Sequence, residues 1–264
     1  REALQTTMIH SIAGQLKDCR LIQQRPFRDP HHSASLPSLV GGGHRAVPGE
    51  ISLAHNGILF LDELPEFSRA TLETLRQPLE TGSVTISRAN AHTTYPARFQ
   101  LVAAMNPCRC GYMDDPSRSC SRAPKCGLDY QSKISGPLLD RMDLHIFVPG
   151  LSVKEMGDMA KGESSQRVLA RVNKAREKQR ERALAFDLNP DTLNAHLKSE
   201  SLEYCAPLSQ ECQSILMTAA EKMNFSARAY HRLIKVARTI ADLEQEESIA
   251  VEHITEALSY RMVH

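Results

Sequence analysis

The pattern of apolar and polar residues divides the chain into a first part with strands and a second part that is helical throughout. Two apolar runs, at residues 58–61 and 99–105, predict strands that are buried on both faces. Residues 84–97 alternate around a polar tip, which predicts a β-hairpin. Leucines at helical spacing predict a helix over residues 68–80, and Pro78 should bend or end it near its last turn.

The other segments complete this division. Residues 143–148 predict a third strand, and residues 20–50 form an irregular stretch rich in Pro, Gly, His and Arg. A loop of that length inside a compact domain is usually functional. Helices are predicted at residues 1–17, 134–140, 164–184, 209–223, 226–243 and 250–261.

The length of 264 residues suits one large domain or two ordinary ones. The pattern predicts an α/β fold with a parallel-sheet core over residues 1–150, a connecting segment with a basic helix over residues 151–185, and a helical domain over residues 186–264. The formal net charge is +1, so any binding to nucleic acid must come from local patches of charge.

The chain has no apolar run of the roughly 18–20 residues that cross a membrane, and its first residues do not form a signal peptide. We therefore expect a cytoplasmic protein without a membrane partner. Four of the seven cysteines lie within residues 108–126. In a protein without a secretion signal, such clustering indicates a metal site before disulfides.

Two adjacent carboxylates, Asp62 and Glu63, follow the first buried strand. Ligands of parallel α/β sheets bind at the carboxyl ends of the strands, where one carboxylate can hold Mg²⁺ and the other can activate a water molecule. This is the Walker B pattern of nucleotide hydrolases; the alternative is a strand that ends in an acidic turn. Asn106 ends the next buried strand and could orient the same water, or it could simply cap a turn before Pro107.

Two arginines extend this set. Arg141 follows a short predicted helix, from which a guanidinium could stabilise charge on the γ-phosphate of a neighbouring subunit, or could pair with Asp140 or Asp143. Arg228 lies in the first turn of a predicted helix, where a cation is unfavourable unless the helix end faces an anion such as a nucleotide phosphate. The alternative is an ordinary surface arginine.

The clustered cysteines are Cys108, Cys110, Cys120 and Cys126, on a polar loop. Four thiolates could close a tetrahedral Zn²⁺ site, which would be structural because no coordination position stays open. The spacing differs from the usual pair of C-x₂-C knuckles, so free thiols are the alternative.

The order of these motifs resembles the magnesium-chelatase-like branch of the AAA+ ATPases, and within it the ComM/YifB family. The segments that carry the resemblance are residues 26–32, 39–43, 48–57, 61–67 and 135–143. The resemblance implies an AAA+ core followed by an all-α lid, a hexameric ring, ATP and Mg²⁺ as cofactors, and a DNA helicase that promotes branch migration in natural transformation. It also implies that residues 20–50 are the helix-2 insert and residues 84–97 the pre-sensor-1 hairpin, both directed at DNA in the ring channel.

The basic and polar residues of these two elements are the expected contacts to the DNA backbone: Arg25, Arg28, His31, His32, His44, Arg45, Arg88, Asn90 and His92. The family's phosphate-binding Gly-x-x-x-x-Gly-Lys-Thr loop is not found in the chain. We expect the core to be truncated at its N-terminus and these residues alone to bind ATP poorly. Two alternatives stay open: a chelatase-like motor subunit that acts on a protein partner, and a non-catalytic fragment that oligomerises or binds DNA.

Overall fold

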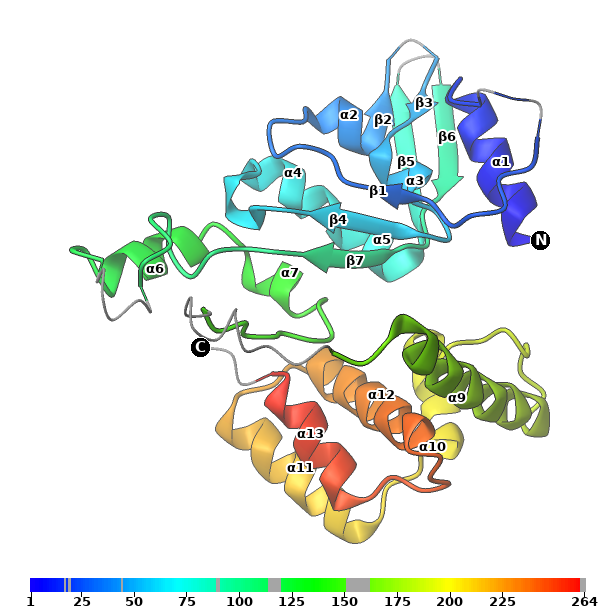
Figure 1. The fold of residues 1–264 in the computed structure, drawn as a ribbon, viewed down its shortest axis with the longest axis vertical. Helices are drawn as coiled ribbons and strands as arrows, with labels where there is room; N and C mark the ends of the chain where they lie inside the picture. The colour runs from blue at the N-terminus through cyan, green and yellow to red at the C-terminus, as the bar shows by residue number, and fades with distance from the viewer. Residues whose placement is uncertain are drawn as a thin grey trace. The chain divides into compact units, whose positions relative to one another are not determined.

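A computed structural model describes residues 1–16, 18, 20–43, 45–88, 91–113, 120–150 and 162–261, with only the backbone described at residues 88 and 91. The chain forms two compact units, Arg1–Met142 and Asp143–His264 (Figure 1). The first unit combines strands and helices, and the second is helical, as an α/β AAA+ core and an all-α lid require. Within the described ranges, no helix is both long and apolar enough to cross a membrane.

The first unit contains the strands and the shorter helices. Its elements are α1 (Glu2–Ile12), β1 (Phe27–Arg28), α2 (Leu36–Val40), β2 (Gly41–Gly42), β3 (Val47–Pro48), α3 (Glu50–Leu53), β4 (Ile58–Leu61), η1 (Leu64–Glu66), α4 (Arg69–Thr74), α5 (Arg76–Thr81), β5 (Ser83–Arg88), β6 (Ala91–Pro96), β7 (Gln100–Ala103), α6 (Lys125–Gln131) and α7 (Gly136–Leu139). The second unit contains α9 (Ser165–Ala185), η2 (Asn194–His196), α10 (Ser199–Cys205), α11 (Gln210–Lys222), α12 (Ala227–Leu243) and α13 (Val251–Ser259).

Three parallel strands in the order β1-β4-β7 form the sheet of the first unit (Figure 1). The two strands predicted from apolar runs are formed as β4 and β7. Burial on both faces is not found: only Leu59 and Leu61, on one face of β4, are buried, and the residues of β7 are half-buried or exposed. Their register pairs Ile58 with Gln100 and Leu61 with Ala103. Because the strands are parallel, both carboxyl ends lie at the same edge of the sheet.

Strand β1 lies inside the stretch that was predicted to be irregular, so that prediction is wrong at this point. Phe27 of β1 pairs with Ile58 in register, and its ring stacks on Phe60 at 6.0 Å between centroids. Gly57 permits the approach, because a Cβ there would lie 2.0 Å from the carbonyl oxygen of Pro26. Two residues are too few to show the period of a strand in the sequence.

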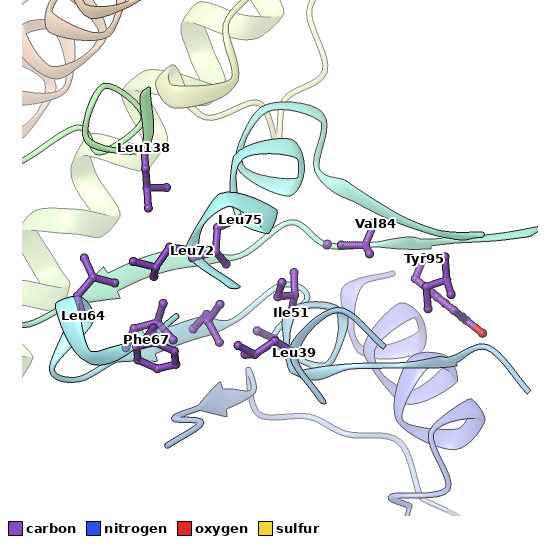
Figure 2. Packing of buried hydrophobic residues seen from close by; sticks show 14 of the residues in the cluster. Leu39, Ile51, Leu64, Phe67, Leu72, Leu75, Val84, Tyr95 and Leu138 are labelled. Carbon is purple, nitrogen blue, oxygen red and sulfur yellow. The ribbon is translucent and has the colours of Figure 1, made fainter. Parts of the chain in front are cut away.

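The core of the first unit lies between the sheet, the helices after it and the hairpin (Figure 2). Leu59 and Leu61 of β4 are 0% and 1% exposed, and Leu72 of α4 is 1% exposed. The predicted hairpin is confirmed: β5 and β6 pair antiparallel from Ser83↔Pro96 to Arg88↔Ala91. Alternation places Val84 and Ile86 of one hairpin face in the core.

Two other predictions differ from the structure. The helix over residues 68–80 is divided at Leu75 into α4 and α5 instead of ending at Pro78. Pro78 then falls in the first turn of α5, where its missing N–H is tolerated. The strand over residues 143–148 is not formed: the segment has no regular secondary structure and pairs with no described strand, and Phe147 is 61% exposed. An apolar run becomes a strand only where a neighbour accepts its hydrogen bonds.

The long helices predicted for the second unit are confirmed as α9, α11, α12 and α13. A buried charge cluster joins α9 to α12. Asp242 is 0% exposed, and it accepts hydrogen bonds from Arg182, Arg238 and Asn194. Burial lowers the pKa of Arg238, whose guanidinium also donates to the carbonyl oxygens of Glu246 and Glu247.

Replacing Asp242 tests how much this charge cluster contributes to the stability of the second unit. Asp242→Ala leaves the Arg238 guanidinium buried without its carboxylate and should lower the free energy of unfolding of the second unit by about 3–5 kcal/mol. The measurement is urea unfolding followed by far-UV circular dichroism. Glu246→Ala, an exposed neighbour, is the control and should change the stability by no more than about 0.5 kcal/mol. Equal losses in both variants would contradict the assignment.

Candidate active site and cysteine cluster

Asp62 and Glu63 form a turn directly after β4, and both side chains are exposed. The Asp62 Oδ1 atom accepts a hydrogen bond of 2.9 Å from the Glu63 backbone N–H. Glu63 has a left-handed backbone (φ 51°, ψ 47°), which costs a residue other than glycine about 1–2 kcal/mol. This conformation directs the chain abruptly into η1 and leaves two carboxylates at the carboxyl edge of the sheet.

Asn106 lies beyond the end of β7 and is also exposed. The register that pairs Leu61 with Ala103 brings the residues after both strands to one edge of the sheet. The Leu64 N–H donates to the carbonyl oxygen of Ala104 at 3.0 Å and joins the two exits. The structure therefore brings Asp62, Glu63 and Asn106 to the same region.

His32 contacts the turn formed by Asp62 and Glu63. The sequence did not indicate this contact. Its Nδ1 atom lies 3.1 Å from the Glu63 Oε2 atom, and its ring meets Phe67 edge-on at 6.4 Å. His32 follows β1, which pairs with β4 in parallel, so the residues after the two strands meet. Recognition of β1 in the sequence would have revealed the contact. The residue expected to touch DNA is thus also a partner of Glu63.

Arg141 is buried in the first unit, with 7% of the residue exposed. Its Nη2 atom lies 2.5 Å from Glu80 Oε2, and its Nη1 atom donates to the carbonyl oxygen of Pro137 at 2.7 Å. The pairing with Glu80 is neither of the two alternatives, Asp140 and Asp143, weighed from the sequence. Asp143 instead accepts from Arg232 at 2.6 Å.

Arg228 is exposed in the first turn of α12, where Ser226 caps the helix by accepting from the Ala229 N–H at 3.2 Å. It belongs to the second unit, whereas Asp62, Glu63 and Asn106 belong to the first. The helix start predicted around residue 226 is confirmed.

The two elements expected to contact DNA are packed on each other. The Tyr95 hydroxyl of β6 donates to the carbonyl oxygen of Ala46 at 2.9 Å. Gly41 of β2 lies so close to the hairpin that an added Cβ would be 2.7 Å from the Ile86 Cδ1 atom. Residues 41–43 and 45–48 therefore pack directly against the hairpin.

The individual basic residues differ in how far they are already paired. Arg28 is committed to Glu50 through two hydrogen bonds of 2.6 and 2.7 Å, which raise the pKa of Arg28. Other residues have exposed or weaker contacts: Arg25 with Glu2, His31 with Ser33, and His92 with Ser87, while Arg45 is exposed. His44, Asn90 and the side chain of Arg88 lie outside the described residues.

The four clustered cysteines converge after β7. Their Sγ atoms all lie within 4.8 Å of one another, and those of Cys108 and Cys110 are 3.2 Å apart, too far for a disulfide. Zn–S bonds of about 2.3 Å in a tetrahedron separate sulfur atoms by roughly 3.8 Å. Cys108 is fully buried, whereas Cys110 is exposed. The donor set and its spacing fit a structural Zn²⁺.

Comparison with known proteins identifies the family. Residues 1–156 match the family model described as magnesium chelatase, subunit ChlI, and residues 162–261 match the model of the ChlI C-terminal part. The chain belongs to the magnesium chelatase family, in its ComM/YifB branch. The AAA+-like core and helical lid described above are therefore those of a chelatase-type protein.

Two bacterial proteins are among the relatives that the chain resembles over nearly its whole length. The chain is 49% identical over 263 residues to the competence protein ComM of Haemophilus influenzae, covering 98% of the chain and 50% of that protein. It is 46% identical over 266 residues to YifB of Escherichia coli, covering 99% and 50%. A remote similarity, 21% over 229 residues, links it to the DNA replication licensing factor mcm6 of Dictyostelium discoideum, covering 82% and 24%. The chain spans about half the length of the bacterial relatives it matches.

Metal analysis tests the cysteine cluster. The chain purified without chelator should contain about one zinc ion, and Cys108→Ser combined with Cys110→Ser should contain none, because two of four ligands are lost. Elemental analysis of the purified protein gives the ratio. Cys205→Ala, which removes a buried thiol of the second unit, is the control and should retain the metal. A wild-type chain without zinc would contradict the assignment.

Proposed function

We propose that the chain is the ATP-hydrolysing part of a hexameric DNA motor of the ComM type, which promotes branch migration or unwinding during natural transformation and recombination. The observation that supports it is the convergence of Asp62, Glu63 and Asn106 at one edge of a parallel sheet. The activity is proposed for a protein of the relatives' length, because the 264 residues contain no Gly-Lys-Thr phosphate-binding loop.

The chemistry follows from the residue types. The Asp62 carboxylate would hold Mg²⁺ through water, and a bound ion would neutralise charge on the phosphates of the nucleotide. Glu63 polarises the attacking water and accepts its proton, and the Asn106 amide orients that water. Glu63 is exposed enough to meet a water, and its contact with His32 engages only the Oε2 atom.

The two arginines complete the proposed ring chemistry. Arg228 binds phosphate within its own subunit, and Arg141 stabilises the charge that develops on the neighbour's γ-phosphate. Arg141 has to leave Glu80 to reach a neighbouring subunit. Its substitution therefore removes an internal ion pair as well, and a test must separate the two effects.

The DNA partner is supported by the relatives and by the paired insert and hairpin. The names of ComM and of mcm6 connect those proteins with competence and DNA replication. Arg45 and His92 are exposed on elements that pack together, which suits contacts to a phosphate backbone. Arg28 we assign to the support of this segment, because Glu50 occupies its guanidinium.

A chelatase-like motor that acts on a protein partner is the second candidate, because the matching family models are those of a magnesium chelatase subunit. The catalytic residues would be the same and the partner would differ. ATP hydrolysis stimulated by DNA favours the first function, and hydrolysis indifferent to DNA favours the second. Absence of nucleotide binding and turnover in the complete protein would leave a non-catalytic role in oligomerisation or DNA binding.

Glu63→Gln in the complete protein tests the catalytic assignment. The amide keeps the size of the side chain but accepts no proton, so ATP turnover should fall at least about a hundredfold while ATP binding and ring formation persist. Steady-state phosphate release and size-exclusion chromatography with ATP provide the measurements. Near-normal turnover would remove Glu63 from the mechanism.

Mixed rings extend this test to Arg141. Arg141→Ala subunits keep Glu63, and Glu63→Gln subunits keep Arg141, so each supplies what its neighbour lacks. Mixtures should recover part of the turnover that both pure variants lose, if Arg141 acts on the adjacent nucleotide. No recovery, with rings still formed, would restrict Arg141 to its internal pair with Glu80.

Arg88→Ala tests the hairpin as a DNA contact. Loss of one phosphate contact should weaken binding of single-stranded DNA several-fold and lower the salt slope of log K by about 0.7. Fluorescence anisotropy with ATP at several salt concentrations measures both. Lys222→Ala, an exposed cation in α11, is the control and should bind as the wild type does. An unchanged slope for Arg88→Ala would exclude the hairpin tip from the DNA path.

A further inference from the structure

Helix α6 links the cysteine cluster to the segment that follows the catalytic turn. Cys126 lies in α6, and Tyr130 follows it by about one turn. Tyr130 is 4% exposed, and Glu66 of η1 is close enough to raise the pKa of its hydroxyl. Lys133 reaches the same carboxylate, with Nζ 3.7 Å from Glu66 Oε1. One carboxylate three residues after Glu63 is thus held by two side chains from the end of α6 and just beyond it.

Burial and the charge of Glu66 both raise the pKa of Tyr130, so the phenol stays protonated beside this carboxylate. The Lys133 ammonium group lies 5.3 Å from the centroid of the Tyr130 ring and adds a cation–π contact. The α6–η1 contact is therefore a small set of mutually supporting interactions.

The same helix also contacts the chain that follows Asn106. The Gln131 side-chain amide donates to the carbonyl oxygen of Pro107 at 3.1 Å. Gly127 lies so close to this segment that an added Cβ would be 2.3 Å from the Met113 sulfur and 3.3 Å from the Pro107 oxygen. The first metal ligand, Cys108, comes two residues after Asn106. The segments that follow β4 and β7 therefore both contact α6 or the residues just after it.

The catalytic turn requires such support. Glu63 has a positive φ of 51°, and residues other than glycine keep this conformation only where the surrounding structure fixes it. Three hydrogen bonds of the turn do this: Glu63 N–H to Asp62 Oδ1 at 2.9 Å, Leu64 N–H to Ala104 oxygen at 3.0 Å, and Glu66 N–H to Glu63 oxygen at 2.7 Å. The contacts of Glu66 with α6 are a further support.

We propose that Zn²⁺ bound by the four cysteines positions the catalytic turn, because it fixes α6 between Glu66 on one side and the segment after Asn106 on the other. The ion joins Cys108, at the exit of β7, to Cys126, on α6. The cysteines, Tyr130 and Lys133 act as positioning residues and do not touch the reacting atoms. The inference rests on the proposed hydrolytic role of Glu63 and Asn106.

Hydrogen exchange of the 264-residue chain, followed by mass spectrometry, tests this link without any enzymatic activity. Removal of zinc by a chelator should accelerate exchange of residues 111–131, as for any structural metal site. It should also accelerate exchange of the hydrogen-bonded amides of Leu64, Glu66 and Phe67 by about tenfold. The double variant Cys108→Ser, Cys110→Ser should behave like the chelated chain, and Cys205→Ala like the zinc-loaded one.

Tyr130→Phe separates the link from the metal site itself. This variant keeps the ring and all four cysteines, so it should retain about one zinc ion and normal exchange at residues 120–126. Loss of the hydroxyl should still accelerate exchange at residues 64–67 several-fold. Unchanged exchange at residues 64–67 in both the chelated chain and Tyr130→Phe, with the cysteine loop destabilised by chelation, would overturn the proposal and leave a purely local metal site.

Failure of this inference is distinct from failure of the proposed function. Exchange at residues 64–67 reports the position of the turn whether or not it hydrolyses ATP. Normal turnover in Glu63→Gln would refute the catalytic role while the exchange data could still show the link. Conversely, a turn that is insensitive to zinc would leave the ATPase proposal intact.

Discussion

The central strand β4 is the element on which the first unit depends. Its backbone is paired with β1 on one side and β7 on the other, and its side chains Leu59 and Leu61 are removed from solvent. Burial of an apolar side chain of this size contributes about 1.5–3 kcal/mol, and these two leucines share one face of the strand. A strand with this environment cannot accommodate a charge, so the first residues free of it, Asp62 and Glu63, must lie at its end. The two carboxylates are exposed because they follow the buried part of the strand.

Charged side chains elsewhere are neutralised within each unit. Asp242 gathers Arg182 and Arg238 in the second unit, and Glu80 and Glu50 hold Arg141 and Arg28 in the first. A buried charge without a partner is costly. Removing one member of such a pair therefore lowers the stability strongly, although the intact pair adds little net stability. Of the residues assigned to ligands in the proposed function, Asp62, Asn106, Arg45 and Arg228 are exposed.

Long elements with a regular period were predictable from the sequence. Short strands that depend on a partner far away in the sequence were not. The runs that became β4 and β7, the hairpin, and helices α11 to α13 have enough residues to show their period. Strand β1 has two residues and owes its existence to Gly57 and Phe60, 30 positions away in sequence. For the same reason the contact between His32 and Glu63 was missed. Residues 143–148 have the composition of a strand but lack a partner strand among the described residues, and composition alone cannot supply one.

The pairing of Arg141 with Glu80 has a thermodynamic consequence for assembly. In the proposed mechanism, this guanidinium exchanges one anion, Glu80 of its own subunit, for another, the phosphate in its neighbour. Ring closure and nucleotide occupancy then become linked functions: whatever factor a bound nucleotide adds to subunit association, association must add to nucleotide affinity. Glu80 neutralises Arg141 in the separate subunit. In the proposed mechanism, assembly would therefore depend on whether the neighbouring nucleotide site is filled.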